Sequence, residues 1–286
     1  MPTKIEKDAV TGRSTTGHEW DGIKELNTPL PRWWLYVFYA CIAWSVGYYV
    51  FYPSLPWVHG VLGWSRRAEL AETMQAERER IRPMLERIRA TPIAAVDRSP
   101  ELRDFAFAGG RAAFADNCAP CHGAGGAGAK GGFPALVDDE WIWGGDLAAI
   151  ERTILYGVRS SHPDTRASQM PRFGADQILT AAQIADTAEH VLSLSGRSTD
   201  GAAAARGSAI FADNCAACHG PAGRGNVELG SPDLADRIWL FGSDKAAIAH
   251  SIHLGRGGVM PAWNTRLDEA TIKMLTVYVH SLGGGR

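Results

Sequence analysis

The sequence has no excess of charge of either sign and few cysteines. Its 29 Lys and Arg residues against 31 Asp and Glu residues leave a formal net charge of −2. This balance excludes the strongly basic surface of a nucleic-acid-binding protein. Five cysteines in 286 residues are too few, and odd in number, for a disulfide scaffold. A mean hydropathy of −0.13 and a single long uncharged run exclude a protein with many membrane spans.

The single long uncharged run covers residues 33–51, with the sequence WWLYVFYACIAWSVGYYVF. At about 1.5 Å per residue, a helix of this length spans about 28 Å, close to the ~30 Å thickness of a hydrocarbon core. Trp and Tyr residues lie near both ends, where amphipathic rings favour the membrane interface. No small-residue cleavage site follows the run, so a signal peptide fits poorly. We predict one transmembrane helix at 33–52.

The second half of the chain contains an internal repeat. Residues 110–123 match residues 207–220 at an offset of 97, and each copy has a later Met-Pro pair, at Met170 and Met260. The first copy has eight additional residues ahead of this pair, within the segment RSSHPDTRASQ. A unit of about 80–90 residues is too long for a solenoid repeat and indicates two homologous domains.

Each copy contains the motif Cys-x-x-Cys-His. On a helical turn this spacing presents two thiols to the vinyl groups of one haem and places the imidazole beneath the iron, as in c-type haem attachment. Two such motifs in matching repeats predict two covalently attached haem c groups. The residues are Cys118, Cys121, His122, Cys215, Cys218 and His219.

Three other interpretations of the motif fit less well. A four-Cys zinc site usually has its two pairs about 15–20 residues apart, whereas these pairs are 97 residues apart. A redox-active disulfide motif would lie in a βαβ context, which neither repeat shows. Structural disulfides would leave the duplicated histidine unexplained.

An electron-transfer haem needs a second axial ligand. Met170 and Met260 are the only methionines at matching repeat positions, and a thioether ligand raises the potential of the iron. We predict that they complete the two sites opposite His122 and His219. Pairing within each copy is the simplest arrangement, and exchange between the two domains remains open. His162, in the insertion of the first copy, is the alternative ligand if the first haem has two histidines.

The haem motif also predicts the topology. Because thioether bonds to haem c are made on the outer face of bacterial membranes, we expect periplasmic haem domains and a cytoplasmic N-terminus in the bacterial inner membrane. Apolar residues at helical spacing predict a helix over 65–90, interrupted or kinked at Pro83.

The predicted fold class is all-α, with one N-terminal transmembrane helix and two tandem domains like class I cytochromes c. The expected segments are a cytoplasmic segment at 1–32, the transmembrane helix at 33–52, a periplasmic connector helix at 53–103, the first cytochrome domain at 104–196, a linker at 197–205 and the second cytochrome domain at 206–286.

The run GHEWDGIKELNTPLPRWW at residues 17–34, followed by one span and two haem motifs, resembles subunit III of the cbb3-type cytochrome c oxidases, the CcoP/FixP family. The resemblance covers essentially the whole chain. It implies a subunit without a catalytic centre of its own, which accepts electrons from a soluble or membrane-bound cytochrome c fed by the cytochrome bc1 complex. It further implies electron transfer to a mono-haem cytochrome subunit and then to the catalytic subunit, which reduces O2 with proton pumping.

Two other functions compete with this relay. One is a membrane-tethered dihaem cytochrome that serves another periplasmic or bc-type redox partner. The other is a dihaem peroxidase, which would need an open sixth iron position and a distal acid or base. Matched Met-Pro pairs in both copies favour closed sites, and therefore electron transfer.

Overall fold

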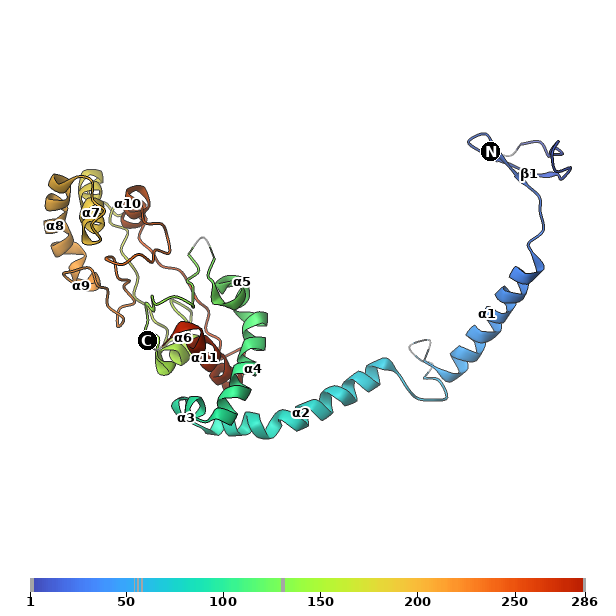
Figure 1. The fold of residues 1–286 in the computed structure, drawn as a ribbon, viewed down its shortest axis with the longest axis horizontal. Coiled ribbons are helices and arrows are strands. Elements are labelled where there is room, and N and C mark those ends of the chain that lie inside the picture. The colour runs from blue at the N-terminus through green and yellow to red at the C-terminus, as the bar shows by residue number, and fades with distance from the viewer. Residues whose placement is uncertain (1–2, 54, 56, 58, 130–131, 285–286) are drawn as a thin grey trace. The chain divides into compact units, whose positions relative to one another are not determined.

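The computed structural model describes residues 3–53, 55, 57, 59–129 and 132–284. The chain divides into two compact units, residues 1–79 and 80–286. The first unit holds a small hairpin and a long apolar helix, and the second holds the helices of both repeats, coloured from cyan to red in Figure 1. Helix α2 (Arg66–Ala90) begins in the first unit and ends in the second.

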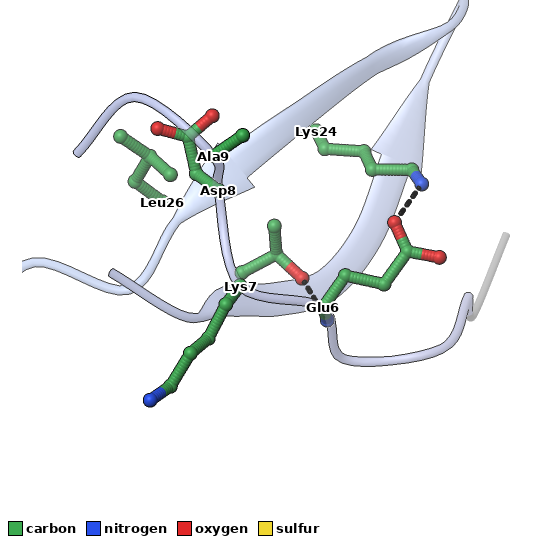
Figure 2. A pocket seen from close by; sticks show the side chains of 7 residues that line it. Glu6, Lys7, Asp8, Ala9, Lys24 and Leu26 are labelled. Atoms are coloured by element: carbon green, nitrogen blue, oxygen red, sulfur yellow. Dashed lines mark hydrogen bonds and ion pairs between the residues drawn. The ribbon is translucent and has the colours of Figure 1, made fainter. Parts of the chain in front are cut away.

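The first unit starts with an antiparallel hairpin of β1 (Thr15–Trp20) and β2 (Ile23–Leu26). Asp21 and Gly22 form the turn with φ values of 49° and 83°, as an Asp-Gly hairpin turn requires. Lys24 reaches back to Glu6 at 2.7 Å across the hollow drawn in Figure 2. The predicted fold class did not include this hairpin, although an Asp-Gly pair is a usual signal for its turn.

Helix α1 (Arg32–Phe51) follows the hairpin and agrees with the predicted span to within one residue at each end. It is long and apolar enough to cross a membrane, and none of its residues is buried. An apolar helix whose side chains are not buried by protein needs another apolar medium around it, which a lipid bilayer supplies.

The second unit begins with the end of α2, which continues as a helix through Pro83. Ile88 in its last turn is completely buried, in a cluster that also includes residues of α3 (Ile93–Arg98), α4 (Pro100–Asn117) and α11 (Glu269–Gly283). Lys273 of α11 donates to the carbonyl oxygens of Arg89 and Thr91, at 2.7 and 3.1 Å. These bonds satisfy carbonyls at the end of α2 that have no partner within the helix.

The helices of the two repeats are exchanged. Helix α4 packs against α11 from the end of the chain, whereas α7 (Ala181–Leu194) packs against α8 (Gly201–Asn214). Figure 1 shows α11, in red, beside α4, in green, while α7, α8 and α10 (Lys245–Leu254) lie together. Packing therefore does not follow the two linear repeats at 104–196 and 206–286.

Two lobes result, and we name them by their residues. Lobe A comprises 100–158 and 259–284, with α4, α6 (Leu147–Tyr156) and α11, and lobe B comprises 168–256, with α7, α8 and α10. The short elements α5 (Ala119–His122) and η1 (Ala124–Gly126) belong to lobe A, and α9 (Ala216–His219) belongs to lobe B. Lobe B is thus a continuous stretch of chain inserted into lobe A.

The chain passes between the lobes twice, outward through residues 159–167 and back through residues 257–258. The eight additional residues of the first copy lie largely in the outward crossover. Arg159 joins the two crossovers, because its Nε donates to the Gly258 carbonyl at 2.6 Å and its Nη1 to the Ser168 carbonyl at 2.5 Å. The insertion thus supplies the connection that the exchange of helices requires.

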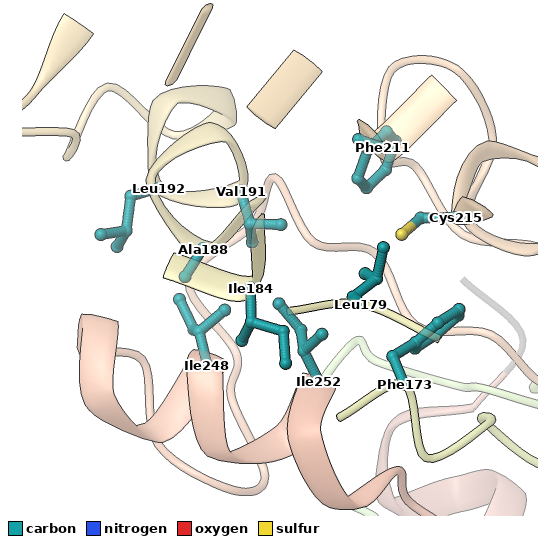
Figure 3. Packing of buried hydrophobic residues seen from close by; sticks show 10 residues of the cluster. All are labelled: Phe173, Leu179, Ile184, Ala188, Val191, Leu192, Phe211, Cys215, Ile248 and Ile252. Atoms are coloured by element: carbon teal, nitrogen blue, oxygen red, sulfur yellow. The ribbon is translucent and has the colours of Figure 1, made fainter. Parts of the chain in front are cut away.

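Each lobe has its own apolar core. In lobe B, side chains of α7, α8 and α10 converge with Phe173 and Leu179 from the preceding loop (Figure 3). In lobe A the corresponding cluster contains Phe114, Ile150, Ile154, Ile272, Leu275, Tyr278 and Val279. Phe114 and Phe211, at matching repeat positions, are each 2% exposed, which makes them central to the two cores.

Glycines at matching repeat positions permit close contact between the packed helices in both lobes. These contacts lead to a prediction about stability. A Cβ on Gly110 would overlap the Met274 carbonyl of α11, and one on Gly207 would overlap the Asp186 carbonyl of α7. We expect Gly110→Ala and Gly207→Ala each to lower the free energy of unfolding by about 1–3 kcal/mol, measured by urea denaturation.

Gly201→Ala is the matched control. Gly201 lies in the first turn of α8 and has no positive φ, and a Cβ added to it would meet no atom within 4 Å. The stability of this variant should therefore be unchanged or slightly higher. A Gly110→Ala protein as stable as the Gly201→Ala protein would contradict the close packing of α4 on α11.

A buried carboxylate gives a second prediction. Glu189 of α7 is 1% exposed and accepts hydrogen bonds from Lys245 Nζ at 2.9 Å, Ser198 Oγ at 2.7 Å and the Thr199 N–H at 3.2 Å. The bond from Lys245, followed by that from Ser198, lowers the pKa of Glu189 from 4.5 to about 2. Its stabilising contribution is therefore complete above pH 4.5 and is lost as the pH falls toward 2.

We expect Glu189→Gln to lower the free energy of unfolding by about 1–3 kcal/mol at pH 7, because it leaves buried donors without an anionic acceptor. The difference from the parent protein should shrink in urea denaturation below pH 4.5. Asp176→Asn, which breaks the exposed Arg172–Asp176 pair, should cost less than about 1 kcal/mol at either pH. Equal losses in both variants would show that the Glu189 contacts contribute no more than a surface pair.

Candidate haem sites

Both Cys-x-x-Cys-His motifs adopt the same backbone turn. Helix α4 ends just before Cys118, and the N–H of His122 donates to the Cys118 carbonyl at 2.9 Å. In lobe B the N–H of His219 donates to the Cys215 carbonyl, also at 2.9 Å. One helical turn thus places the first cysteine and the histidine on the same side of the backbone, as the motif predicts.

The first cysteine of each motif is a largely buried, neutral thiol. Burial raises the pKa of Cys118 and of Cys215 to about 11, and the neighbouring cysteine in each motif adds to this shift. Within the described residues, no three His, Cys, Asp or Glu side chains come together as a candidate metal site. The two Cys pairs therefore do not assemble into a shared four-Cys centre.

A backbone carbonyl orients each histidine. His122 Nδ1 lies 3.0 Å from the Pro134 carbonyl oxygen, and His219 Nδ1 lies 3.1 Å from that of Pro232. A carbonyl can only accept, so Nδ1 carries the proton and Nε2 keeps a free lone pair for iron. Burial lowers the pKa of His219 and favours the neutral ring. The sequence repeat contained both prolines, but their pairing with the histidines needed the tertiary structure.

The two methionines lie in the lobe opposite to their own sequence repeat. Met260 exchanges backbone hydrogen bonds with Val158 at 2.9 and 3.0 Å, and its side chain packs on the lobe A core, as Cys118 does. The N–H of Met170 donates to the Arg256 carbonyl at 3.1 Å, and its side chain packs on the lobe B core, which includes Cys215. Pairing within each copy, the simplest expectation, does not match this packing.

Glycines at matching repeat positions explain how the backbones of Met260 and Met170 approach the ends of α6 and α10 so closely. Gly157 and Gly255 have φ values of 69° and 68°. A side chain on Gly157 would overlap the Met260 backbone, and one on Gly255 would overlap the Met170 backbone. Only glycine tolerates both the left-handed conformation and this proximity.

The surroundings of the motifs fit a haem group. Leu136 and Trp141 border the lobe A core, and Leu234 and Trp239 border that of lobe B. The Nε1–H of Trp141 is buried without a partner in the part of the chain that the structure describes. An unused donor at the border of an apolar core suits a large apolar group with acceptor oxygens at its edge, which a haem is.

A pair of carboxyl groups lies where the lobes meet. Glu140 of lobe A accepts the Asp233 N–H of lobe B at 3.1 Å and hydrogen-bonds to Asp236. Burial, together with the neighbouring aspartates, raises the pKa of Glu140 to about 7. The sequence did not indicate the contact between Glu140 and Asp233, because these residues are 93 positions apart along the chain.

His162 lies in the outward crossover, and its ring lies against that of Tyr156 in a tilted arrangement, at a centroid distance of 4.8 Å. Its Nε2 is 3.0 Å from the Asn264 amide, and its Nδ1 accepts the Asp164 N–H at 3.1 Å. Both ring nitrogens therefore have protein partners. The structure places His162 beside the loop that follows Met260, a position that the sequence did not indicate.

Comparison with known families divides the chain in the same order. The N-terminal domain of cytochrome oxidase-cbb3, FixP, matches residues 12–59. Cytochrome c matches residues 107–195, and cytochrome c oxidase, cbb3-type, subunit III, matches residues 202–279. The predicted fold, with a candidate transmembrane helix and two cytochrome c domains, is confirmed.

Relatives match the chain over its full length. The cbb3-type oxidase subunit FixP of Bradyrhizobium diazoefficiens is 53% identical, with all of both chains covered. The subunit CcoP of Azospirillum brasilense is 51% identical over 98% of this chain and 99% of the relative. The subunit CcoP of Cereibacter sphaeroides is 46% identical, again with all of both chains covered. The chain therefore belongs to the CcoP/FixP family of cbb3-type cytochrome c oxidase subunits and is a cytochrome c electron-transfer subunit.

Proposed function

We propose that the chain binds two haem c groups and relays electrons from a cytochrome c donor toward the O2-reducing subunit of a cbb3-type oxidase. The observation that carries this proposal is the pairing, in each lobe, of a Cys-x-x-Cys-His turn with a methionine on the same apolar core. O2 reduction and proton pumping belong to other subunits of the complex in this proposal.

Each lobe contributes the same functional groups. Cys118 and Cys121, or Cys215 and Cys218, hold a haem through thioether bonds, and the bound haem supplies reversible one-electron chemistry. His122 or His219 presents a neutral Nε2 to the iron, because its Nδ1–H is committed to a backbone carbonyl. The apolar core keeps water away and, with a methionine as the second ligand, favours the reduced state.

The axial ligands are crossed between the repeats in this proposal. Met260 completes the site of His122 in lobe A, and Met170 completes the site of His219 in lobe B. The support is the backbone pairing of Met260 with Val158 and the packing of each methionine on the same core as the corresponding motif cysteine.

The proposed location is the bacterial inner membrane. Helix α1 spans the bilayer once, the hairpin lies on the cytoplasmic side, and both lobes lie in the periplasm. The support is the presence of α1 together with two motifs for haem attachment, which takes place outside the membrane. The proposed partners are the catalytic and mono-haem cytochrome subunits, with a soluble or membrane-bound cytochrome c or the bc1 complex as donor.

Crossed ligation predicts which methionine a given haem depends on. In a protein whose lobe A haem is removed by Cys118→Ala and Cys121→Ala, Met170→Leu should abolish the near-infrared thioether band of the remaining ferric haem. Met260→Leu in the same background should leave that band in place. Absorption spectra of the oxidised proteins measure the outcome.

The reciprocal background is the control. With Cys215→Ala and Cys218→Ala, Met260→Leu should abolish the band and Met170→Leu should preserve it. The opposite dependence in both backgrounds would establish pairing within each repeat. Loss of neither band would overturn the assignment of methionine ligands.

Purification through a tag on this chain tests the wider role. Extraction from native membranes in mild detergent should recover c-type and b-type haem, copper and cyanide-sensitive O2 uptake together. Recovery of two c haems alone, without b haem or O2 uptake, would instead favour a tethered dihaem cytochrome with another redox partner.

A further inference from the structure

The outward crossover does more than connect the lobes, because His162 attaches it to the loop that carries Met260. The His162 ring contacts Asn264, four residues beyond Met260, and lies tilted against the ring of Tyr156 at the end of α6. Lobe B has no equivalent, since the insertion occurs only in the first copy and the position that matches Asn264 is Gly174.

The hydrogen bonds define the state of the His162 ring. Nδ1 accepts from the Asp164 N–H, so in the neutral ring the proton is on Nε2 and points to Asn264. The Asn264 Oδ1 is buried and has no partner in the described residues when the amide nitrogen is placed toward the ring. Rotating the amide by half a turn directs Oδ1 to Nε2–H, so the side chain of Asn264 can hydrogen-bond to this tautomer of the ring.

Asn264 belongs to the segment that holds Met260 against lobe A. The Trp263 N–H donates to the Ile154 carbonyl at 3.1 Å, and the Asn264 N–H donates to that of Leu155 at 3.3 Å. A surface groove remains between the crossover and this segment, lined by residues that include Ser160, His162, Val259, Pro261 and Arg266. The contact between His162 and Asn264 therefore bridges the two sides of this groove next to Met260.

We propose that His162 is a positioning residue that, through Asn264, holds the Met260 loop closed and so retains Met260 as an axial ligand. This inference rests on the proposed role of Met260 in iron ligation. Its consequence is an asymmetry between the haems: the bond to Met260 depends on the crossover, whereas the bond to Met170 does not.

Two substitutions separate the contributions of the ring nitrogens. His162→Gln places an amide near the position of Nε2 and keeps the bond to Asn264. His162→Asn reaches only the position of Nδ1 and loses that bond. Both variants lose the ring contact with Tyr156. His162→Asn keeps an acceptor for the Asp164 N–H and loses the contact with Asn264, whereas His162→Gln keeps the contact with Asn264.

The test titrates the oxidised full-length protein with imidazole, which displaces a weakly held methionine and shifts the Soret band. The titration step that is missing in Met260→Leu identifies the site of Met260. In His162→Asn this step should occur at about tenfold lower imidazole concentration, the equivalent of one hydrogen bond. In His162→Gln it should stay near the parent value, and the step of Met170 should not move in either variant.

The outcomes distinguish the two levels of the proposal. If Met260→Leu leaves both thioether bands intact, Met260 is not a ligand and the proposed site fails. If Met260→Leu removes one band but His162→Asn and His162→Gln titrate alike, the positioning role of His162 is overturned. If both steps of His162→Asn shift together, the effect is a general loss of stability and the role is also overturned.

Discussion

The exchange of segments between the lobes depends on two short backbone contacts, between Val158 and Met260 and between Arg256 and Met170. Val158 lies just after α6 and Arg256 just after α10, and each bonds to a methionine that belongs to the other repeat. Because Gly157 and Gly255 precede these contacts with positive φ, the backbones can approach without a side chain between them. The terminal helices then follow their methionine loops, so α11 packs on α4 and α7 packs on α8.

Because of this arrangement, the core of lobe A is built from segments at the beginning and at the end of the second unit. Its core includes Ile272 and Leu275 from the C-terminal helix, and the same helix holds the end of α2 through Lys273. Lobe B is continuous in sequence and encloses its buried Glu189 with Lys245 and the residues between α7 and α8. Loss of the C-terminal helix would thus remove the main packing partner of α4 in the first haem lobe while the second kept all its helices.

The lobes share one architecture and differ in how their methionine loops are held. In both lobes a backbone bond holds this loop, from the Asn264 N–H to the Leu155 carbonyl at 3.3 Å and from the Gly174 N–H to the His253 carbonyl at 3.2 Å. Lobe A adds the contact of the crossover histidine His162 with Asn264. Two haems with the same ligand set can differ in potential through hydrogen bonding and solvent access around them. Such differences are a means by which a relay can order electron transfer between similar sites.

The amino-acid sequence alone determined the transmembrane helix, the repeat, the haem motifs and the two candidate methionines, because each depends on residues close together or on an exact repeat. The Asp21-Gly22 pair also indicates a hairpin turn, but no hairpin was predicted. Only the tertiary structure decided which methionine packs on the same core as which Cys-x-x-Cys-His turn, since the repeats carry the same core pattern and either terminal helix could fill either lobe. The connections between the lobes decided this arrangement, because the long outward crossover and the short return at Gly257–Gly258 allow the exchange of helices. The hydrogen bonds from Arg159 to the carbonyls of Gly258 and Ser168 stabilise these connections.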